Sequence, residues 1–364
     1  MKNTAKVKTI MLSISDKCNL DCVYCYQINK SGKTMSCEIA KDTITKHLMN
    51  AKDFDEVYID LTGGEIFLEF DFIKEICNWA WNRTWPKPFL FFATSNGTLV
   101  HGKIQEWLTN NRKKFWVGLS IDGTREMHNK NRSNSYDLID FDFFKKNWPT
   151  QGIKMTISPW TLSELSKGII ELQEKGFIVN ASFAQLSNWS DPEYKNILKK
   201  ELKVLADYYI EHSQVPMSSI LDISLHSIIK RNNKPIKWCG TGTHMVSIDT
   251  EGNEYPCHFF MPNTMNNSSY WRVTNFSNPD DLIDSSCKSC KLFSMCPTCY
   301  GANIVQNGHP AIRDKFLCEF TKIRAAAISY IIGKKLIKGV IKLENQKLIN
   351  DTIFSINEIQ KEII

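Results

Sequence analysis

Three cysteines near the N-terminus constrain this chain more than any other feature of its sequence. Cys18, Cys22 and Cys25 form a Cys-x3-Cys-x2-Cys run directly after the apolar segment Thr9–Ser15. Three thiolates in one short loop can hold three irons of a four-iron cluster and leave the fourth iron without a protein ligand. An open iron can bind and cleave a small molecule. A zinc knuckle is the alternative, but structural zinc usually takes four ligands and the run offers three.

The run resembles the signature of radical S-adenosylmethionine (SAM) enzymes, in which an aromatic residue, here Tyr24, precedes the last cysteine. This resemblance implies that the open iron chelates the amino and carboxylate groups of SAM, with Tyr24 among the cofactor-binding residues. It also implies that one electron splits the sulfonium and that a 5′-deoxyadenosyl radical then abstracts hydrogen from the substrate. An electron donor such as flavodoxin or ferredoxin is expected.

The composition of the 364-residue chain narrows the class of protein. Lys and Arg number 45 against 39 Asp and Glu, and this net charge of +6 is too mild and dispersed to favour nucleic-acid binding. We find neither a signal-peptide core nor a run of about 20 apolar residues, so we expect a cytoplasmic protein without a membrane span.

The number of cysteines supports the interpretation of the chain as a cytoplasmic metal-binding protein. Twelve cysteines without a secretory signal are not expected to pair as disulfides, because the cytosol keeps thiols reduced. Ten of them fall into two patterned groups, at 18–25 and 239–318. Cys37 and Cys77 are left over and are interpreted as structural thiols.

The first part of the chain alternates apolar runs with helix-period segments, the pattern of repeated βα units and a parallel sheet. The predicted strands are Thr9–Ser15, Glu56–Thr62, Phe89–Ser95, Phe115–Asp122, Ile153–Ser158 and Val179–Gln185. Helices are predicted near 36–50, 69–83, 99–112, 137–147 and 161–175, with Ser36 and Asp71 as caps. Six βα repeats fit the α/β fold that the resemblance implies, a partial (β/α)6 TIM-like barrel.

The active-site residues of such barrels lie at the ends of the strands. After the second strand, Gly63 and Gly64 let backbone approach a ligand closely, and Glu65 could accept a hydrogen bond from an ammonium. This resembles the Gly-Gly-Glu-Pro motif that contacts the SAM amino group, although Ile66 replaces the usual proline.

The next two strand ends carry small polar side chains. Ser95 and Asn96 resemble part of the family's Thr-Asn-Gly-Thr stretch, and Ser120 with Asp122 are placed to reach the same nucleoside. Asn-Gly and Asp-Gly also occur as ordinary turn dipeptides. Their occurrence at successive strand ends after the cysteine run favours SAM binding.

Seven further cysteines begin at Cys239. Their layout is Cys239-x12-Gly252-x4-Cys257, then Cys287-x2-Cys290-x5-Cys296-x2-Cys299, then Cys318. Two Cys-x2-Cys pairs indicate metal. The layout resembles the small cysteine-rich SPASM domain appended to many radical SAM peptide-modifying enzymes, which holds two auxiliary four-iron clusters. Three 4Fe-4S clusters are therefore expected in all.

The resemblance also implies two ligand sets. One is Cys287, Cys290, Cys296 and Cys318; the other is Cys239, Cys257 and Cys299, which leaves one iron without an obvious cysteine. Cys299 follows Cys296 by two intervening residues where three are usual. Related enzymes place a further cysteine near the position of His244 and Met245, so the second cluster has either an open iron or a non-cysteine ligand. A zinc-binding module is the alternative.

The residue after Cys257 bears on the substrate. In enzymes that oxidise a sulfatase cysteine or serine to formylglycine, an aspartate that resembles a general base follows this cysteine, whereas here it is His258. Histidine can act as a base near neutral pH, or it can simply order a loop. The sulfatase-maturase assignment is therefore placed second.

The resemblance implies modification of a ribosomally synthesised precursor peptide, by a crosslink or an oxidation. Some eight residues precede the first strand, so we expect either a separate leader-recognition protein or direct binding of the peptide or protein substrate. Three hypotheses stay open: this peptide maturase, a formylglycine-forming sulfatase maturase, and a non-enzymatic zinc or iron–sulfur electron-transfer module.

The expected domains are a radical SAM barrel over 1–213, a helical bridge over 214–235, the SPASM domain over 236–320 and a basic amphipathic tail over 321–364. A long helix is predicted over Asp191–Ser213 and a second one near 218–231. The tail carries most of the net positive charge. It is interpreted as a helix packed on the barrel, with docking of an acidic leader as the alternative.

Overall fold

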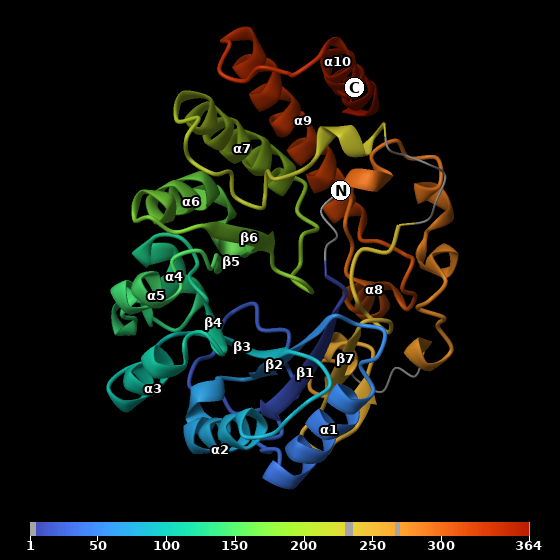
Figure 1. Cartoon of the computed structure of the whole chain (residues 1–364). Helices are drawn as coiled ribbons and strands as arrows, with labels where there is room; N and C mark the ends of the chain where they lie inside the picture. The colour runs from blue at the N-terminus through green and yellow to red at the C-terminus, as the bar shows by residue number, and fades with distance from the viewer. Residues whose placement is uncertain (1–4, 230–235, 266–269, 364) are drawn as a thin grey trace. The chain divides into compact units, whose positions relative to one another are not determined.

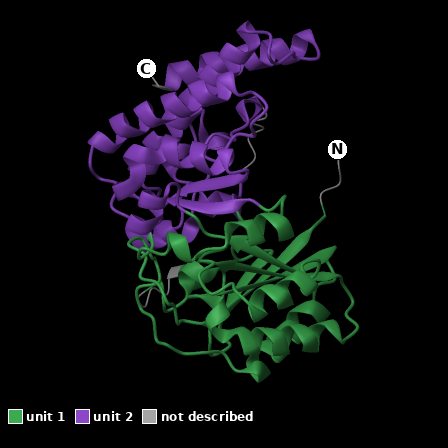
Figure 2. Cartoon of the chain, turned by 90° about the vertical axis from the view of Figure 1, so that its left-hand side faces the viewer, with its two compact units in different colours: residues 1–121, 132–151, 239–277 green, residues 122–131, 152–238, 278–364 purple. Residues whose placement is uncertain are grey.

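The computed structural model describes residues 5–229, 236–265 and 270–363 (Figure 1). The chain forms two compact units, which Figure 2 shows in two colours. Unit 1 comprises residues 1–121, 132–151 and 239–277, and unit 2 comprises 122–131, 152–238 and 278–364. The predicted domain boundaries describe family modules and stay a prediction; the end of the predicted helical bridge, residues 230–235, lies outside the described residues.

Unit 1 is built on one sheet with the strand order β4-β3-β2-β1-β7-β8. Its strands are β1 Val7–Ser15, β2 Glu56–Gly63, β3 Phe89–Ser95, β4 Phe115–Leu119, β7 Met245–Ile248 and β8 Glu254–Tyr255. All neighbours are parallel except β7 and β8. The side chains of Ile10, Leu12, Ile59, Leu61 and Phe91 are fully buried at its centre.

The helices of unit 1 follow its strands. They are α1 Cys37–Met49, α2 Phe70–Trp81, α3 Lys103–Asn111 and α5 Phe141–Asn147 (Figure 1). Ser36 caps α1 as predicted, because its side chain accepts a hydrogen bond from the Ile39 amide. Asp71 is not a cap: it lies inside the first turn of α2 and pairs with Lys74, while Glu69 occupies the capping position.

Unit 2 contains the parallel pair β5 Ile153–Ile157 and β6 Val179–Phe183. Its helices are α4 Arg125–Asn131, α6 Leu165–Glu174, α7 Glu193–Glu211, α8 Tyr300–Asn307, α9 Lys315–Ile337 and α10 Gln346–Ile363. The C-terminal helix α9 packs against both α7 and α10 (Figure 1). The tail is thus a packed helical element, as expected, with Ile328 and Ile331 buried.

The six predicted strands and the long helix α7 are present, so the mixed α/β fold with a parallel sheet is confirmed. The predicted helix near 218–231 is wrong within its described part, which contains only a 3-10 turn over Leu225–Ser227. Tertiary partners hold this segment instead: the Ser218 amide donates to the Tyr209 hydroxyl, and the Ser219 hydroxyl donates to the Ala181 carbonyl. No helix within the described ranges combines the length and apolarity that crossing a bilayer requires.

Candidate functional site

The first cysteine run forms a loop after β1 in unit 1, and its three thiols are partly exposed. The Cys25 amide donates to the Cys22 carbonyl at 3.0 Å, which folds the loop into a turn. Burial raises the pKa of the Cys18 thiol, and the nearby Glu65 carboxylate and Cys25 thiol act in the same direction. The structure therefore brings Cys18 close to both Cys25 and the end of β2.

Gly63 and Gly64 approach this loop more closely than any other residue type could. A Cβ atom on Gly63 would lie 2.1 Å from the Ser15 carbonyl oxygen, and one on Gly64 would lie 1.9 Å from that of Lys17. The Gly64 amide donates to the Ser15 carbonyl at 2.9 Å. In this structure the two glycines thus let β2 clamp the segment that enters the cysteine loop.

Glu65 continues this clamp with a carboxylate buried to 1% exposure. One oxygen accepts hydrogen bonds from the Ser95 hydroxyl at 2.8 Å and the Phe67 amide at 3.2 Å; the other accepts from the Asn96 amide at 2.8 Å. Burial raises the pKa of Glu65, and these donors oppose the rise. The second oxygen keeps a lone pair for a further donor such as an ammonium.

Asn96 ties the end of β3 to the cysteine loop. Its side-chain amide donates to the Asn19 side-chain oxygen at 2.9 Å, and Asn19 in turn donates to the Thr98 hydroxyl at 2.8 Å. The Asn96 oxygen accepts from the Thr98 amide at 3.0 Å. The sequence did not single out Asn19, the residue after Cys18, because a polar loop residue carries no pattern of its own.

The far side of the loop meets residues 132–134. The Arg132 guanidinium carbon lies 5.4 Å from the centre of the Tyr24 ring, a cation–π contact. The Asp21 amide donates to the Ser133 hydroxyl at 2.9 Å, and Ser133 has a left-handed backbone with φ of 52°. Arg132 therefore covers one face of the Tyr24 ring.

Ser120 and Asp122 belong to different compact units. Ser120 is buried at the end of β4, where its amide donates to the Ser95 carbonyl. Asp122 is fully buried in unit 2 and accepts from the Thr156 amide at 2.8 Å and from the Asn131 side chain at 3.2 Å. Their common contact with a nucleoside stays a prediction.

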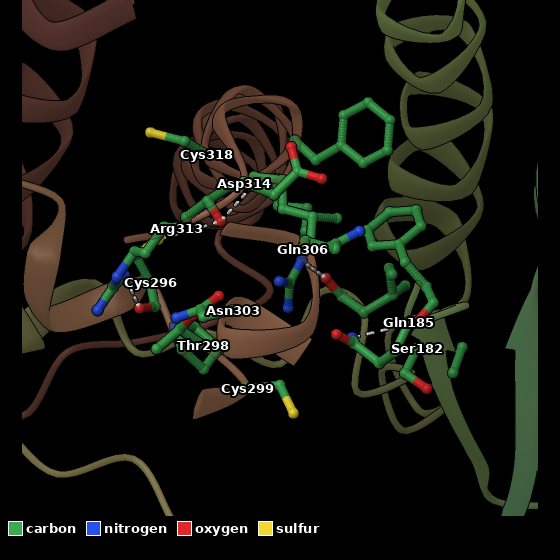
Figure 3. Close-up of a pocket in the computed structure, with 18 residues that line it drawn as sticks. Ser182, Gln185, Cys296, Thr298, Cys299, Asn303, Gln306, Arg313, Asp314 and Cys318 are labelled. Carbon is green, nitrogen blue, oxygen red and sulfur yellow. Dashed lines mark hydrogen bonds between the residues drawn. The ribbon is translucent and has the colours of Figure 1, made fainter. Parts of the chain in front are cut away.

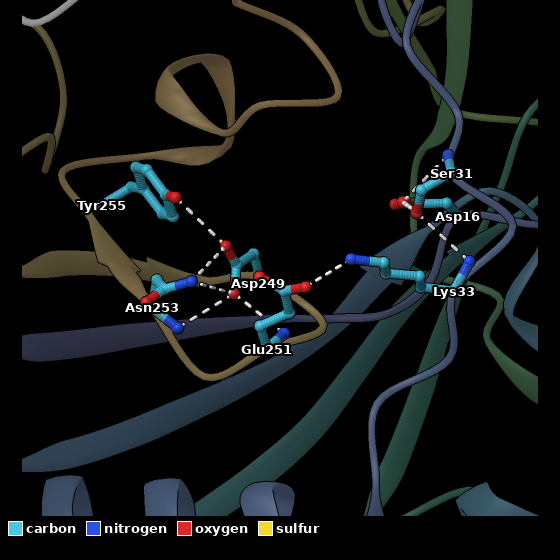
Figure 4. Close-up of polar contacts among 7 residues, drawn as sticks. All are labelled: Asp16, Ser31, Lys33, Asp249, Glu251, Asn253 and Tyr255. Carbon is cyan, nitrogen blue, oxygen red and sulfur yellow. Dashed lines mark hydrogen bonds and ion pairs between the residues drawn. The ribbon is translucent and has the colours of Figure 1, made fainter. Parts of the chain in front are cut away.

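The chain that leaves the cysteine loop is anchored by Asp16. Its carboxylate accepts from the Ser31 hydroxyl and from the Asn263 side chain at 3.0 Å. Lys33 pairs with Glu251 in the β7–β8 turn, where Asp249 accepts several hydrogen bonds (Figure 4). These contacts join the first cysteine motif to the segment that carries Cys257.

Cys239 and Cys257 lie in neighbouring segments of unit 1. The Gly242 amide donates to the Pro256 carbonyl at 3.1 Å, which holds the two segments together. The His244 ring packs so closely on Gly240 that a Cβ there would be 2.8 Å from its Nε2. Cys299, the third member of this predicted ligand set, belongs to unit 2.

Cys287, Cys290, Cys296 and Cys318 lie near one another in unit 2. Burial is the main cause that raises the pKa of the Cys318 thiol to about 11, and the other three thiols raise it further. The other three cysteines thus lie near Cys318, which agrees with the predicted ligand set of one four-iron cluster. Across the three described ranges, no three or more His, Cys, Asp or Glu side chains converge as they would around a single metal ion.

Cys299 occupies a separate environment. Its sulfur caps α8 by accepting from the Ala302 amide at 3.5 Å. The sulfurs of Cys299 and Cys318 point away from each other in Figure 3. This arrangement is consistent with the expectation that the two cysteines serve different clusters.

His258 begins a 3-10 turn directly after Cys257. Its ring lies 5.4 Å from the Tyr26 ring and 4.8 Å from the Phe259 ring, between centroids. Tyr26 directly follows Cys25 in sequence. The position of His258 is therefore next to the first cysteine loop within unit 1.

Comparison with known proteins agrees with this architecture, although no family model matches the chain. A cysteine-type anaerobic sulfatase-maturating enzyme of Clostridium perfringens is 25% identical over 327 residues, covering 78% of this chain and 85% of that protein. The radical SAM cyclopropyl synthase TigE of Paramaledivibacter caminithermalis is 23% identical over 357 residues, covering 87% and 73%.

Solved structures show the same fold. The structure titled native anSMEcpe with bound AdoMet and Cp18Cys peptide matches with a TM-score of 0.69 at 21% identity, covering 92% of this chain and 99% of that one. Streptococcus suis SuiB bound to precursor peptide SuiA matches with a TM-score of 0.57 at 17% identity, covering 86% and 76%.

The cysteine motif, the parallel sheet and these sequence relatives together define the class of protein. The chain is similar in sequence and fold to radical SAM enzymes that carry a C-terminal SPASM domain. Within this class, its relatives are of the maturase type and include both sulfatase-maturating enzymes and a cyclopropyl synthase.

Proposed function

We propose that this protein cleaves SAM reductively at a four-iron cluster held by Cys18, Cys22 and Cys25, and that it modifies a peptide or protein by hydrogen abstraction. One observation carries the proposal. The loop with these three cysteines is fastened by direct hydrogen bonds to the carboxyl ends of β2 and β3, where the polar residues predicted to bind SAM also lie.

The residues of this site have distinct roles in the proposal. Gly63 and Gly64 set the distance between β2 and the loop, and Glu65 orders the amide of Asn96. The remaining lone pair of Glu65 would accept a hydrogen bond from the SAM ammonium, and Ser95 and Asn96 would contact the nucleoside. When bound, the cluster supplies the electron that breaks the sulfonium bond.

The first test is formation of 5′-deoxyadenosine from SAM with dithionite, in anaerobically reconstituted protein. We expect turnover in the native chain and none after the triple change of Cys18, Cys22 and Cys25 to Ala, while the auxiliary clusters keep their iron. Cys37→Ala is the matched control, because Cys37 begins α1 outside both cysteine groups. Deoxyadenosine from the triple variant, or zinc in place of iron, would reject the assignment.

Two auxiliary clusters complete the proposal. Cys287, Cys290, Cys296 and Cys318 would close one cluster fully, and Cys239, Cys257 and Cys299 would hold the other. Iron and sulfide analysis should then give about twelve irons per chain. About eight irons would mean that one of the two auxiliary sets holds no cluster.

For the substrate we propose a peptide or protein side chain, and two chemistries are candidates. Crosslinking or oxidation of a precursor peptide is supported by the similarity to TigE, which spans 87% of this chain. Formylglycine formation is supported by sulfatase-maturating relatives from two Clostridium species, which match 78% and 85% of it.

A sulfatase-derived peptide with a reactive Cys, assayed beside its Ser and Ala versions, separates the two chemistries. An aldehyde that a hydrazide probe captures from the Cys or Ser peptide would establish the formylglycine chemistry. If the chemistry uses His258 as its base, His258→Gln should abolish the aldehyde and leave reductive SAM cleavage without peptide intact. Deoxyadenosine without aldehyde from all three peptides would favour a precursor-peptide substrate.

A further inference from the structure

Arg313 is a partly buried cation beside the predicted ligand set of Cys287, Cys290, Cys296 and Cys318 in unit 2. Its Nη1 donates to the Cys296 carbonyl oxygen at 2.5 Å, and its guanidinium carbon lies 5.0 Å from the centre of the Phe293 ring. Its other two nitrogens, Nε and Nη2, are buried and have no hydrogen-bond partner among the described residues. Buried guanidinium donors are costly to leave unmatched, so this pair indicates a missing acceptor.

The surroundings of Arg313 suggest what that acceptor is. The Arg313 guanidinium lies near the Cys287 thiol. Arg313 also precedes Asp314, the cap of α9, and Cys318 lies in the first turns of that helix. Arg313 thus stands among the segments that bring Cys287, Cys296 and Cys318 together.

A cavity of about 300 Å³ opens on this position (Figure 3). Its lining includes Arg313 and two of the four cysteines, Cys296 and Cys318, together with Thr321 and Arg324. The Thr321 hydroxyl lies 3.5 Å from the Cys296 sulfur. The cavity wall thus brings polar side chains next to the Cys296 sulfur.

We infer that Arg313 donates its Nε–H and Nη2–H groups to the sulfurs of the cluster held by Cys287, Cys290, Cys296 and Cys318, and that its charge raises the reduction potential of this cluster. Arg313 is a positioning and tuning residue rather than an iron ligand. This inference rests on the proposed auxiliary cluster and is independent of the peptide that is modified.

The physical reason is electrostatic. Reduction adds one negative charge to a group that four thiolates already make negative, and a nearby, partly buried guanidinium stabilises that added charge. Hydrogen bonds to cluster sulfurs and nearby charges are the means by which proteins set the potential of such clusters. Solvent screens the Nε and Nη2 side of this guanidinium less than it screens an exposed cation, because these two nitrogens are buried.

Two neighbouring cations are less suited to this role. Arg324 is partly buried, but it donates through Nε to the Ile220 carbonyl and through Nη2 to the Ser219 carbonyl. Lys322 lies near Cys318 and Cys290, yet its side chain is 32% exposed and pairs with Glu319. Lys322 is thus a matched control: it is a cation near the same cysteines, but water and Glu319 screen its charge.

The test compares full-length Arg313→Gln, Arg313→Lys and Lys322→Gln with the native chain, each made in the background that lacks Cys18, Cys22 and Cys25. Iron content and thermal unfolding are measured first. Redox titration followed by electron paramagnetic resonance then gives the potentials of the auxiliary clusters. At a fixed potential, Arg313→Gln should lower the ratio of reduced to oxidised cluster about tenfold, equivalent to ~59 mV for one electron.

Arg313→Lys should shift the same signal in the same direction by a smaller amount, because the charge stays and one planar pair of donors is lost. Lys322→Gln should shift it least. If Arg313→Gln loses the cluster, the Arg313→Lys variant still tests the inference. An unchanged cluster potential in Arg313→Lys, or a shift no larger than that of Lys322→Gln, overturns the inference. Absence of iron from the Cys287 set in the native chain would instead reject the proposed cluster.

Discussion

The Cys18–Cys25 loop and the Cys287–Cys299 segment differ in what orders them. The first is held by a parallel sheet, because hydrogen bonds join Ser15, Lys17 and Asn19 to residues at the ends of β2 or β3. The second runs through the 3-10 turns Ser285–Cys287 and Phe293–Met295, and the backbone hydrogen bonds of its described residues up to Cys296 join residues three apart. Long-range backbone pairing fixes a loop before metal arrives, whereas local turns leave the ligands to be fixed by the metal.

Metal removal should therefore give the largest difference between the two regions. We expect amide hydrogen exchange in 284–299 to rise at least about 100-fold in the metal-free protein, while 56–64 and 89–95 stay protected. Mass-spectrometric exchange on reconstituted and chelator-treated protein measures this. Equal deprotection of both regions would show that the sheet does not order the first loop by itself.

Gly64→Ala breaks the first region directly. A Cβ atom 1.9 Å from the Lys17 carbonyl must displace backbone, so we expect a loss of about 3 kcal/mol in unfolding free energy, with at least about 100-fold less deoxyadenosine. Denaturant melts and the SAM cleavage assay check the two effects.

Gly333→Ala is the matched control for that change. Gly333 lies inside α9 and nothing is within 4 Å of the added carbon. The control should stabilise the protein by up to about 1 kcal/mol. If both alanine variants behave alike, the close approach at Gly64 is not what holds the loop.

Asn96→Ala should have a smaller effect. It removes the donor to Asn19 and the acceptor for the Thr98 amide, at a cost of about 1–3 kcal/mol. We expect SAM affinity of the reconstituted enzyme to fall roughly tenfold, measured by equilibrium dialysis. Asn196→Ala, which loses only an exposed contact with Glu193, should leave affinity unchanged. Unchanged SAM affinity in the Asn96 variant would separate this residue from cofactor binding.

The smallest effect concerns the helices of unit 2, which we expect to stay folded in the metal-free protein. Tyr209 on α7 is fully buried and donates to the Gln173 side chain on α6 at 3.0 Å, and burial raises the pKa of its phenol to about 12 from an ordinary 10. Ionisation is harder in the folded state, so the stabilisation is complete below pH 10 and is lost as pH rises to 12.

Tyr209→Phe in metal-free protein should therefore flatten the decline in stability between pH 10 and 12 and cost about 1 kcal/mol at pH 8. Denaturant midpoints across this range provide the measurement. Identical slopes in both proteins would contradict the assignment, and loss of the transition without metal would show that the helices also depend on the clusters.

The sequence anticipated much of the fold for a definite reason. β-branched and aromatic runs of five to nine residues, separated by capped helices, specify strands and helices locally, and β3 has the bounds that were predicted. It could not foresee that β7 would pair with β1, because that register joins Thr9 to Met245 across most of the chain. Nor could it identify the partners of Ser218, which replace a predicted helix with turns.

By itself, the sequence determined which cofactors the chain can bind. Cysteine spacing limits which metals can be held and how many ligands each receives, both at Cys18, Cys22 and Cys25 and at the later cysteines. Only the tertiary structure decided how that chemistry is positioned. It turned Gly63 and Gly64 into a clamp on the cysteine loop and left two nitrogens of Arg313 buried beside Cys296. Close approach and desolvation arise between residues distant in sequence, and so become defined only when the chain packs.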